Sequence, residues 1–189
     1  MNSGNELKDI VRLCREGNSS AQEKLYKLYY GSMMNVCLRY AKNADDAVEV
    51  LNTAFLKVFQ NIDKYFGEGE YLHAWIRRIM VNTSLDRIRF EKNRYNNTVP
   101  LNINNDSKHI ENEAISQLAE GDLIKMIEDL PPTSRTVFNL FVFENYTHKE
   151  IGEMVNITES ASQWHLLNAR RILMKKLTDI NIKESVING

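Results

Sequence analysis

The chain has 189 residues, of which 43% are apolar and 26% charged, and its formal net charge is −1. This composition is typical of a globular protein, and the near-neutral charge argues against one that binds nucleic acid over its whole surface. No apolar run approaches the roughly 20 residues that span a bilayer, no secretory signal is visible, and two cysteines cannot form a disulfide framework. We therefore expect a cytoplasmic protein without membrane insertion of its own, and the few glycines and prolines favour helices.

Three helices are predicted in the first half of the chain. Ser20 and Glu23 have the spacing of a capping box, and Asn43 is a candidate cap for the second helix. The expected inward residues of the first helix are Leu25, Leu28, Tyr29, Met33, Val36, Cys37 and Tyr40. Those of the second are Val48, Leu51, Phe55, Val58, Phe59 and Ile62, and those of the third are Leu72, Trp75, Ile76, Ile79 and Thr83. Because Cys37 lies within an apolar stripe, we expect a buried rather than a reactive thiol.

The helical periodicity then stops. Residues 93–112 are rich in asparagine and contain one proline, a composition typical of a mobile connector and longer than an ordinary loop. We therefore predict an all-α protein of two small helical domains, 1–92 and 113–189, joined by a flexible linker over 93–112.

The second half has the pattern of a helix-turn-helix. Pro131 and Pro132 stop one helix, and Thr133 is the expected cap of the next. Thr147 and Glu150 form a capping box before a short helix. The candidate left-handed turn residue is Asn156, and Thr158 is the expected cap of the last helix, whose inward stripe is Ser162, Leu166, Ala169, Leu173 and Leu177. A short helix, a brief turn and a second helix with a polar outer face are typical of DNA binding.

Two segments of the sequence resemble one protein family. GEGEYLHAWIRRIMVNTSLDRIR (residues 67–89) and LPPTSRTVFNLFVFENYTHKEIGEMVNITESASQWHLLNARRIL (residues 130–173) are similar to the extracytoplasmic-function group of the bacterial sigma-70 family. Members are RNA polymerase sigma factors with two helical domains. The resemblance covers about 25–177, and two matching blocks in the right order make it far more specific than a helix-turn-helix alone.

The resemblance implies that the helix from Asp45 to Asn61 docks on core RNA polymerase. Its outward residues are Asp45, Glu49, Asn52, Thr53, Leu56 and Gln60, an acidic edge with an exposed leucine. Asn52 and Thr53 stand where the family usually has glutamine and glutamate, and Val48 replaces a frequent acid. Docking is therefore expected to be less electrostatic here, and an ordinary solvated face is the alternative.

The same resemblance assigns the third helix and the loop before it to the −10 promoter element. The predicted DNA contacts are Phe66, Tyr71, Arg78, Asn82, Arg89 and Lys92. Arginine and lysine can meet phosphates, asparagine can bond a base edge, and an aromatic ring can stack on an unpaired base. Glu68 and Glu70 repel phosphate, so the loop is expected to bond a base rather than the DNA backbone. A plain interhelical turn is the alternative.

The last helix is expected to lie in the major groove of the −35 element. The predicted contacts are Ser160, Gln163, Trp164, Leu167, Asn168, Arg170, Arg171 and Lys175. Gln163 and Asn168 replace commonly basic residues, and Trp164 replaces a small one. Because amides pair with adenine and apolar groups meet thymine methyls, we expect an A/T-leaning −35 sequence. The alternative is that Trp164 packs on another domain or a regulatory partner.

Two other functions remain as alternatives. The four histidines lie in separate segments without a metal-binding or phosphate-binding motif, so we expect no enzyme, no cofactor and no metal. A helix-turn-helix regulator that acts without polymerase would leave the first block without a role. The expected partners are core RNA polymerase and promoter DNA, and the resemblance adds an anti-sigma factor as a probable third.

Overall fold

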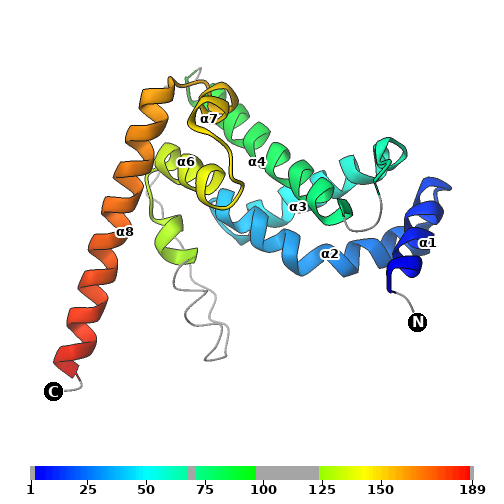
Figure 1. Cartoon of the computed structure of the whole chain (residues 1–189), viewed down its shortest axis with the longest axis horizontal. Helices are drawn as coiled ribbons and strands as arrows, with labels where there is room; N and C mark the ends of the chain where they lie inside the picture. The colour runs from blue at the N-terminus through cyan, green and yellow to red at the C-terminus, as the bar shows by residue number, and fades with distance from the viewer. Residues whose placement is uncertain (1–2, 68–70, 97–123, 188–189) are drawn as a thin grey trace. The chain divides into compact units, whose positions relative to one another are not determined.

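The computed structural model describes residues 3–67, 71–96 and 124–187, and all regular structure in these ranges is helical (Figure 1). The contacts divide the chain into two compact units, Met1–Ile103 (unit 1) and Asn104–Gly189 (unit 2). The all-α prediction with two helical units is therefore confirmed. Most of the predicted linker lies outside the described residues, but α4 continues through 93–96.

Unit 1 is built from four α-helices and a short 3-10 helix. These are α1 (Ser3–Arg15), α2 (Ser19–Tyr40), α3 (Ala44–Gln60), η1 (Ile62–Lys64) and α4 (Leu72–Asn96). The second, third and fourth α-helices pack against one another, and α1 packs on α2 and η1. The largest fully buried side chains of this core are Leu25, Met33, Leu51, Phe55, Ile62, Leu72, Ile76, Met80 and Leu85.

Two features of this core confirm the predictions. The side chain of Asn43 accepts a hydrogen bond from the Asp46 amide at 2.8 Å, so this residue caps α3. Cys37 is completely buried, and burial raises the pKa of its thiol to about 12. The thiol therefore stays protonated near neutral pH and is unreactive.

Other details of the first unit were predicted wrongly. Because α2 begins at Ser19, its cap is Asn18, whose side chain accepts from the Ala21 amide at 3.0 Å, and Ser20 is already inside the helix. Glu23 forms no capping box and instead pairs with Lys27.

Two predicted core residues of unit 1 lie at the surface. The exposed fraction is 58% for Leu28 and 36% for Val48. The buried stripe of α3 runs through small residues, Ala47 and Ala54, beside Val50 and Leu51. Large apolar residues were the basis of the prediction, so it missed the two alanines that are completely buried.

Unit 2 contains α6 (Pro132–Val142), α7 (His148–Val155) and α8 (Glu159–Ile187), preceded by a helical turn over residues 124–128. Helix α8 packs against both α6 and α7. The buried apolar residues of unit 2 include Ile127, Leu140, Ile151, Leu166, Ala169 and Leu173.

The helix-turn-helix forms as predicted. Thr147 and Glu150 make the reciprocal capping box, and Asn156 ends α7 with a left-handed φ of 56°. The Thr158 hydroxyl accepts from the Ala161 amide at 3.1 Å, so it caps α8. Gly152 is required, because a Cβ there would lie 2.8 Å from the Ile157 carbonyl oxygen in the turn.

Two predictions for unit 2 were wrong. Helix α6 already begins at Pro132, so Thr133 lies inside its first turn and makes no cap, because proline suits the first helical position. Leu177 is 49% exposed, so the buried stripe of α8 ends at Leu173.

Candidate nucleic-acid interfaces

The first turns of α8 present an uncovered face. Ser160, Gln163, Trp164 and Leu167 are all exposed, with exposed fractions of 59% for Trp164 and 68% for Leu167. The opposite face of the helix is anchored by Ser162, which is fully buried and hydrogen-bonded to His148 Nδ1 at 2.9 Å. This anchor fixes the rotation of α8 and therefore the direction of the exposed side chains.

Trp164 belongs to the surface of unit 2 rather than to its core. Its ring meets the edge of His165 at a centroid distance of 4.9 Å. His165 in turn hydrogen-bonds Ser134 of α6 at 3.0 Å, and burial lowers the pKa of this histidine. The indole therefore lies exposed against His165, whose position is fixed by its hydrogen bond to Ser134.

Asn168 is less free than its helical position predicts. Its side-chain amide donates to the Ser134 hydroxyl at 3.4 Å, and its oxygen accepts from Arg171 at 3.0 Å. The side chain is partly buried because α6 runs alongside α8 at this point. Gln163 is the more accessible of the two amides predicted to read bases.

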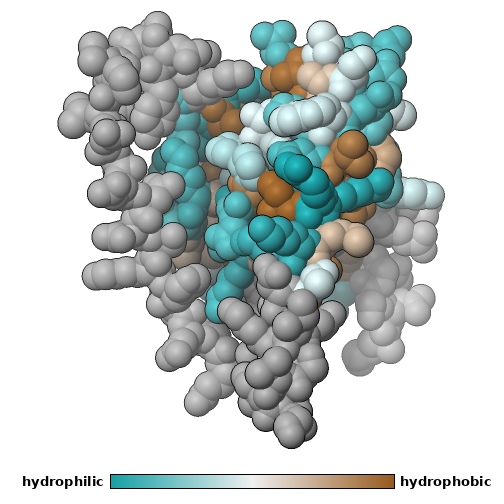
Figure 2. Space-filling view, turned by 90° about the vertical axis from the view of Figure 1, so that its left-hand side faces the viewer, coloured by the Kyte–Doolittle hydropathy of each residue, from teal (hydrophilic) through white to brown (hydrophobic). Residues whose placement is uncertain are grey.

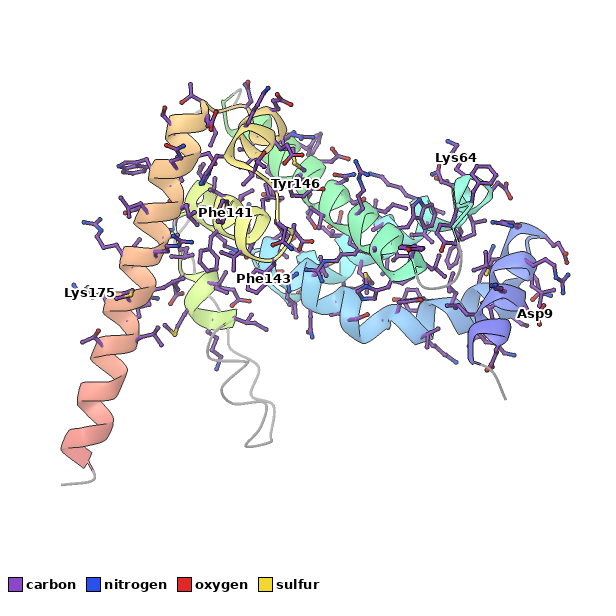
Figure 3. All side chains as sticks on the ribbon, in the orientation of Figure 1. Asp9, Lys64, Phe141, Phe143, Tyr146 and Lys175 are labelled. Atoms are coloured by element: carbon purple, nitrogen blue, oxygen red, sulfur yellow. The ribbon has the colours of Figure 1, made fainter. Side chains whose placement is uncertain are left out.

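Three basic side chains continue the exposed face of α8. Arg170 lies over the Phe141 ring at 5.9 Å, and Arg171 and Lys175 are exposed. Figure 3 shows Lys175 projecting from the side of α8 that faces away from α6. Lys176, by contrast, forms an ion pair with Asp129.

Several large apolar side chains are exposed on unit 2. These are Val142, Trp164, Leu167, Met174 and Leu177. On the face drawn in Figure 2, apolar residues emerge in separate areas between hydrophilic ones. A surface that alternates apolar and polar groups suits a nucleic acid groove better than a large apolar partner.

In unit 1 the outer face of α3 is also uncovered. All six residues predicted there, Asp45, Glu49, Asn52, Thr53, Leu56 and Gln60, are exposed, and Leu56 is 57% exposed. Two of them already have partners within the unit, since Glu49 pairs with Arg87 and Asn52 accepts from the Tyr26 hydroxyl at 2.9 Å. The acidic edge is thus partly neutralised, and Leu56 is its most exposed apolar group.

The residues predicted for the −10 element lie on α4 and at the segment before it. Phe66 and Tyr71 are 90% and 66% exposed, and Arg78 and Asn82 are exposed on α4. Arg89 is exposed and pairs with Asp86 at 3.0 Å. Residues 68–70 and the side chain of Lys92 lie outside the described residues.

A cavity of about 300 Å³ opens between the end of α3, η1 and α4. Its lining residues are Lys57, Asn61, Lys64, Trp75, Ile79, Asn82 and Thr83. Within the described part of the chain, the buried hydroxyl of Thr83 has no hydrogen-bond partner. An aromatic wall, amide groups and cations together suit a planar, polar ligand attached to a phosphate.

Sequence reasoning identified only one of the residues that line this cavity as a DNA contact. Asn82 was predicted as a base contact, but Lys57, Asn61 and Lys64 were not. A signal exists, because these three residues recur four and three positions apart and so share one side of the chain. Trp75 was expected to be ordinary core, but it is only partly buried and lines the cavity.

One basic residue of α4, Arg87, does not face DNA. Arg87 pairs with Glu49, with Glu91 at 3.1 Å and with Asp46 at 3.3 Å. Hydrogen bonds to Glu49 and then Glu91 raise the pKa of Arg87 above its ordinary value. This arginine joins α3 to α4 and is committed to carboxylates rather than to phosphate.

Comparison with known proteins places both units in one family. The Sigma-70 region 2 family matches residues 25–94, and the Sigma-70, region 4 family matches residues 120–173, so together they span more than half of the chain. The ECF RNA polymerase sigma factor SigW of Bacillus subtilis is 26% identical over 184 residues, covering 92% of this chain and 98% of that protein. The ECF RNA polymerase sigma-E factor of Haemophilus influenzae is 22% identical over 178 residues, covering 89% and 93%.

Among solved structures, the chain is similar to the sigma factor RpoE from Bartonella quintana, crystallised with the anti-sigma factor NepR. The TM-score is 0.48 at 14% identity, and the match covers 82% of this chain and 96% of that one.

Two further observations concern the described residues only. None of their helices has both the length and the apolar character needed to cross a bilayer. They also contain no cluster of three or more histidine, cysteine, aspartate or glutamate side chains arranged to hold a metal ion.

We predict that Arg87→Met destabilises α3 and α4 by about 1–3 kcal/mol, because three carboxylates lose the cation that they share. Native-state hydrogen exchange at the amides of these two helices measures the effect, which should shrink at high salt. Arg78→Met, at an exposed position on the same helix, is the control. Equal protection in the two variants would contradict a joining role for Arg87.

Proposed function

The chain belongs to the extracytoplasmic-function group of the sigma-70 family of RNA polymerase sigma factors, and we propose how its two units divide the work. It is a sigma factor, which directs core RNA polymerase to promoters and initiates transcription. We propose that residues 1–92 dock on core polymerase and read the −10 element, and that residues 113–189 read the −35 element. Residues 93–112 are the linker between them. The observation that carries this division is that separate region 2 and region 4 matches fall in order on the two units.

Core polymerase docks on the outer face of α3. Leu56 supplies an exposed apolar centre, and Asp45, Thr53 and Gln60 lie around it as a polar rim. Interfaces commonly combine an apolar centre with such a rim. Because Arg87 already neutralises Glu49, the apolar centre contributes more here than the acidic edge does.

Unit 1 binds one strand of the −10 element after the duplex has opened. Phe66 and Tyr71 offer exposed rings for stacking on unpaired bases, and the cavity beside Asn82 is large enough for a base. Lys64 lines that cavity and attracts the attached phosphates, whereas Lys57 in the same lining is already paired with Asp86 at 3.2 Å. Arg78, Arg89 and Lys92 hold the neighbouring backbone.

The −35 element is read by α8 in the major groove. Gln163 bonds base edges, while Trp164 and Leu167 meet thymine methyl groups. Arg170, Arg171 and Lys175 bind phosphates along the same side, and Ser160 bonds the backbone at the start of the helix. Asn168, held by Ser134, supports Arg171 through its side-chain oxygen.

The remaining functional expectations follow from the family. The protein acts in the cytoplasm as a non-enzymatic initiation factor that needs no cofactor of its own. Members of the group are commonly held inactive by an anti-sigma factor, and we propose that one covers the exposed faces of α3 and α8. A regulator that works without polymerase would leave the region 2 match unexplained.

We predict that Leu56→Arg weakens binding to core RNA polymerase by about 30-fold or more, because a charge replaces the apolar centre of the interface. Titration of labelled protein with core enzyme measures the affinity. Leu28→Arg is a matched control, since Leu28 is exposed to the same degree, 58% against 57%, on another helix of the same unit. Equal affinity of the two variants would show that the docking surface lies elsewhere.

We predict that Trp164→Ala weakens −35 binding by about 1–3 kcal/mol, concentrated at one or two base pairs. Replacing the contacted thymine by uracil removes only its methyl group, so it should weaken the wild-type protein and not the variant. Met174→Ala on the same helix, where Met174 is 68% exposed, is the control.

Binding to randomised −35 duplexes measures which base pairs lose affinity in Trp164→Ala. Binding to the matched thymine and uracil duplexes measures the contribution of the methyl group. If Trp164→Ala keeps the wild-type base preference at every position, base reading by Trp164 is contradicted. That result would instead assign Trp164 to packing against a protein partner.

A further inference from the structure

Arg15 is the last residue of α1 and lies outside the segments that the family comparison matches. Its guanidinium reaches across to η1, where Nε donates at 3.4 Å to the carbonyl of Ile62, the first residue of η1, and Nη2 donates to the carbonyl of Tyr65, the residue directly after η1. Helix α1 packs beside η1, and Figure 3 labels one residue on each, Asp9 and Lys64. A single side chain therefore bonds one carbonyl at the start of the short helix and one directly after it.

The Tyr65 carbonyl belongs to the peptide group that joins Tyr65 to Phe66. The Tyr65 ring is only 4% exposed and packs on Trp75 at a centroid distance of 5.4 Å. On the other side of Phe66, a Cβ on Gly67 would lie 2.8 Å from the Tyr65 ring, so the backbone passes directly against it. The backbone is thus held before and after Phe66, while the phenyl ring itself is 90% exposed.

We propose that Arg15 is a positioning residue that fixes Phe66 as a stacking platform for an unpaired base of the −10 element. The inference rests on the proposed function of Phe66. An aromatic ring contributes most to binding when its direction is set beforehand, because no freedom is then lost when the base arrives. Because the backbone before Phe66 sets the direction of its Cα–Cβ bond, the bond from Arg15 restricts the region in which the phenyl ring can lie.

Arg12 provides a matched comparison on the same helix. It is exposed, and its ion pairs among the described residues are local, with Glu16 at 2.8 Å and Asp9 at 3.9 Å. Replacing it by alanine removes the same charge from α1 without touching η1. A general effect of charge on DNA attraction would therefore appear in Arg12→Ala as well as in Arg15→Ala.

The test uses the full chain bound to core polymerase and a single-stranded oligonucleotide that this complex selects from a randomised pool. Each position of the strand is replaced in turn by an abasic residue, and the ratio of intact to abasic affinity is measured. This ratio is taken within one protein sample, so a smaller folded fraction cannot change it. For the wild-type protein, the ratio of intact to abasic affinity should be about tenfold at one position, in the range expected for stacking.

Three variants then decide the role of Arg15. Phe66→Ala should reduce the ratio at that position to about one, Arg15→Ala should reduce it to about threefold or less, and Arg12→Ala should leave it unchanged. The double variant Arg15→Ala/Phe66→Ala should match Phe66→Ala alone, since Arg15 acts through Phe66. Arg15→Lys, which offers one donor group in place of the fork, should fall between Arg15→Ala and wild type.

Two outcomes would overturn the inference in distinguishable ways. An unchanged ratio in Arg15→Ala, with the ratio lost in Phe66→Ala, would show that Phe66 stacks without help from Arg15. If no position in the wild-type strand depends on its base, the proposed −10 function of Phe66 fails, and the role of Arg15 fails with it.

Discussion

Small buried residues fix which faces of α3 and α8 point outward, and with them the proposed contacts of these two helices. Ala47 and Ala54 of α3 and Ser162 and Ala169 of α8 are completely buried. Small side chains let helices approach closely and admit only one rotation about each helix axis. With those faces turned inward, α3 presents Leu56 and α8 presents Trp164 to the outside. The docking and reading surfaces are therefore consequences of the core rather than additions to it.

Ion pairs then decide which charges are available to partners. Arg87 is held by carboxylates of α3 and α4, and Lys176 is held by Asp129. Arg78, Arg171 and Lys175 remain exposed on helix faces that are assigned to DNA. A chain with a net charge of −1 can therefore bind a polyanion, because its basic groups are concentrated at particular faces while other cations are neutralised internally.

Most helix caps and the left-handed turn residue could be predicted from the sequence, whereas contacts between helices could not. The caps at Asn43, Thr147 and Thr158 and the left-handed Asn156 each depend on residues within four positions, and all were predicted correctly. The Ser20 capping box failed because Asn18 competes for the same helix start. The exposure of Leu28 and Val48, the cavity around Lys57, the commitment of Arg87 and the reach of Arg15 to Tyr65 all depend on which helices meet. No periodicity along one helix contains that information.

The central claim is that the two units act together to bring polymerase to a promoter with two separated elements. Its most direct test is transcription by purified core RNA polymerase, with and without this protein, from a library of duplexes randomised at two hexamers. We expect transcripts that require both proteins and come from templates sharing one sequence near −35 and another near −10 at fixed spacing. Transcription no greater than that of core enzyme alone, or selection of a single element that does not require core enzyme, would contradict it.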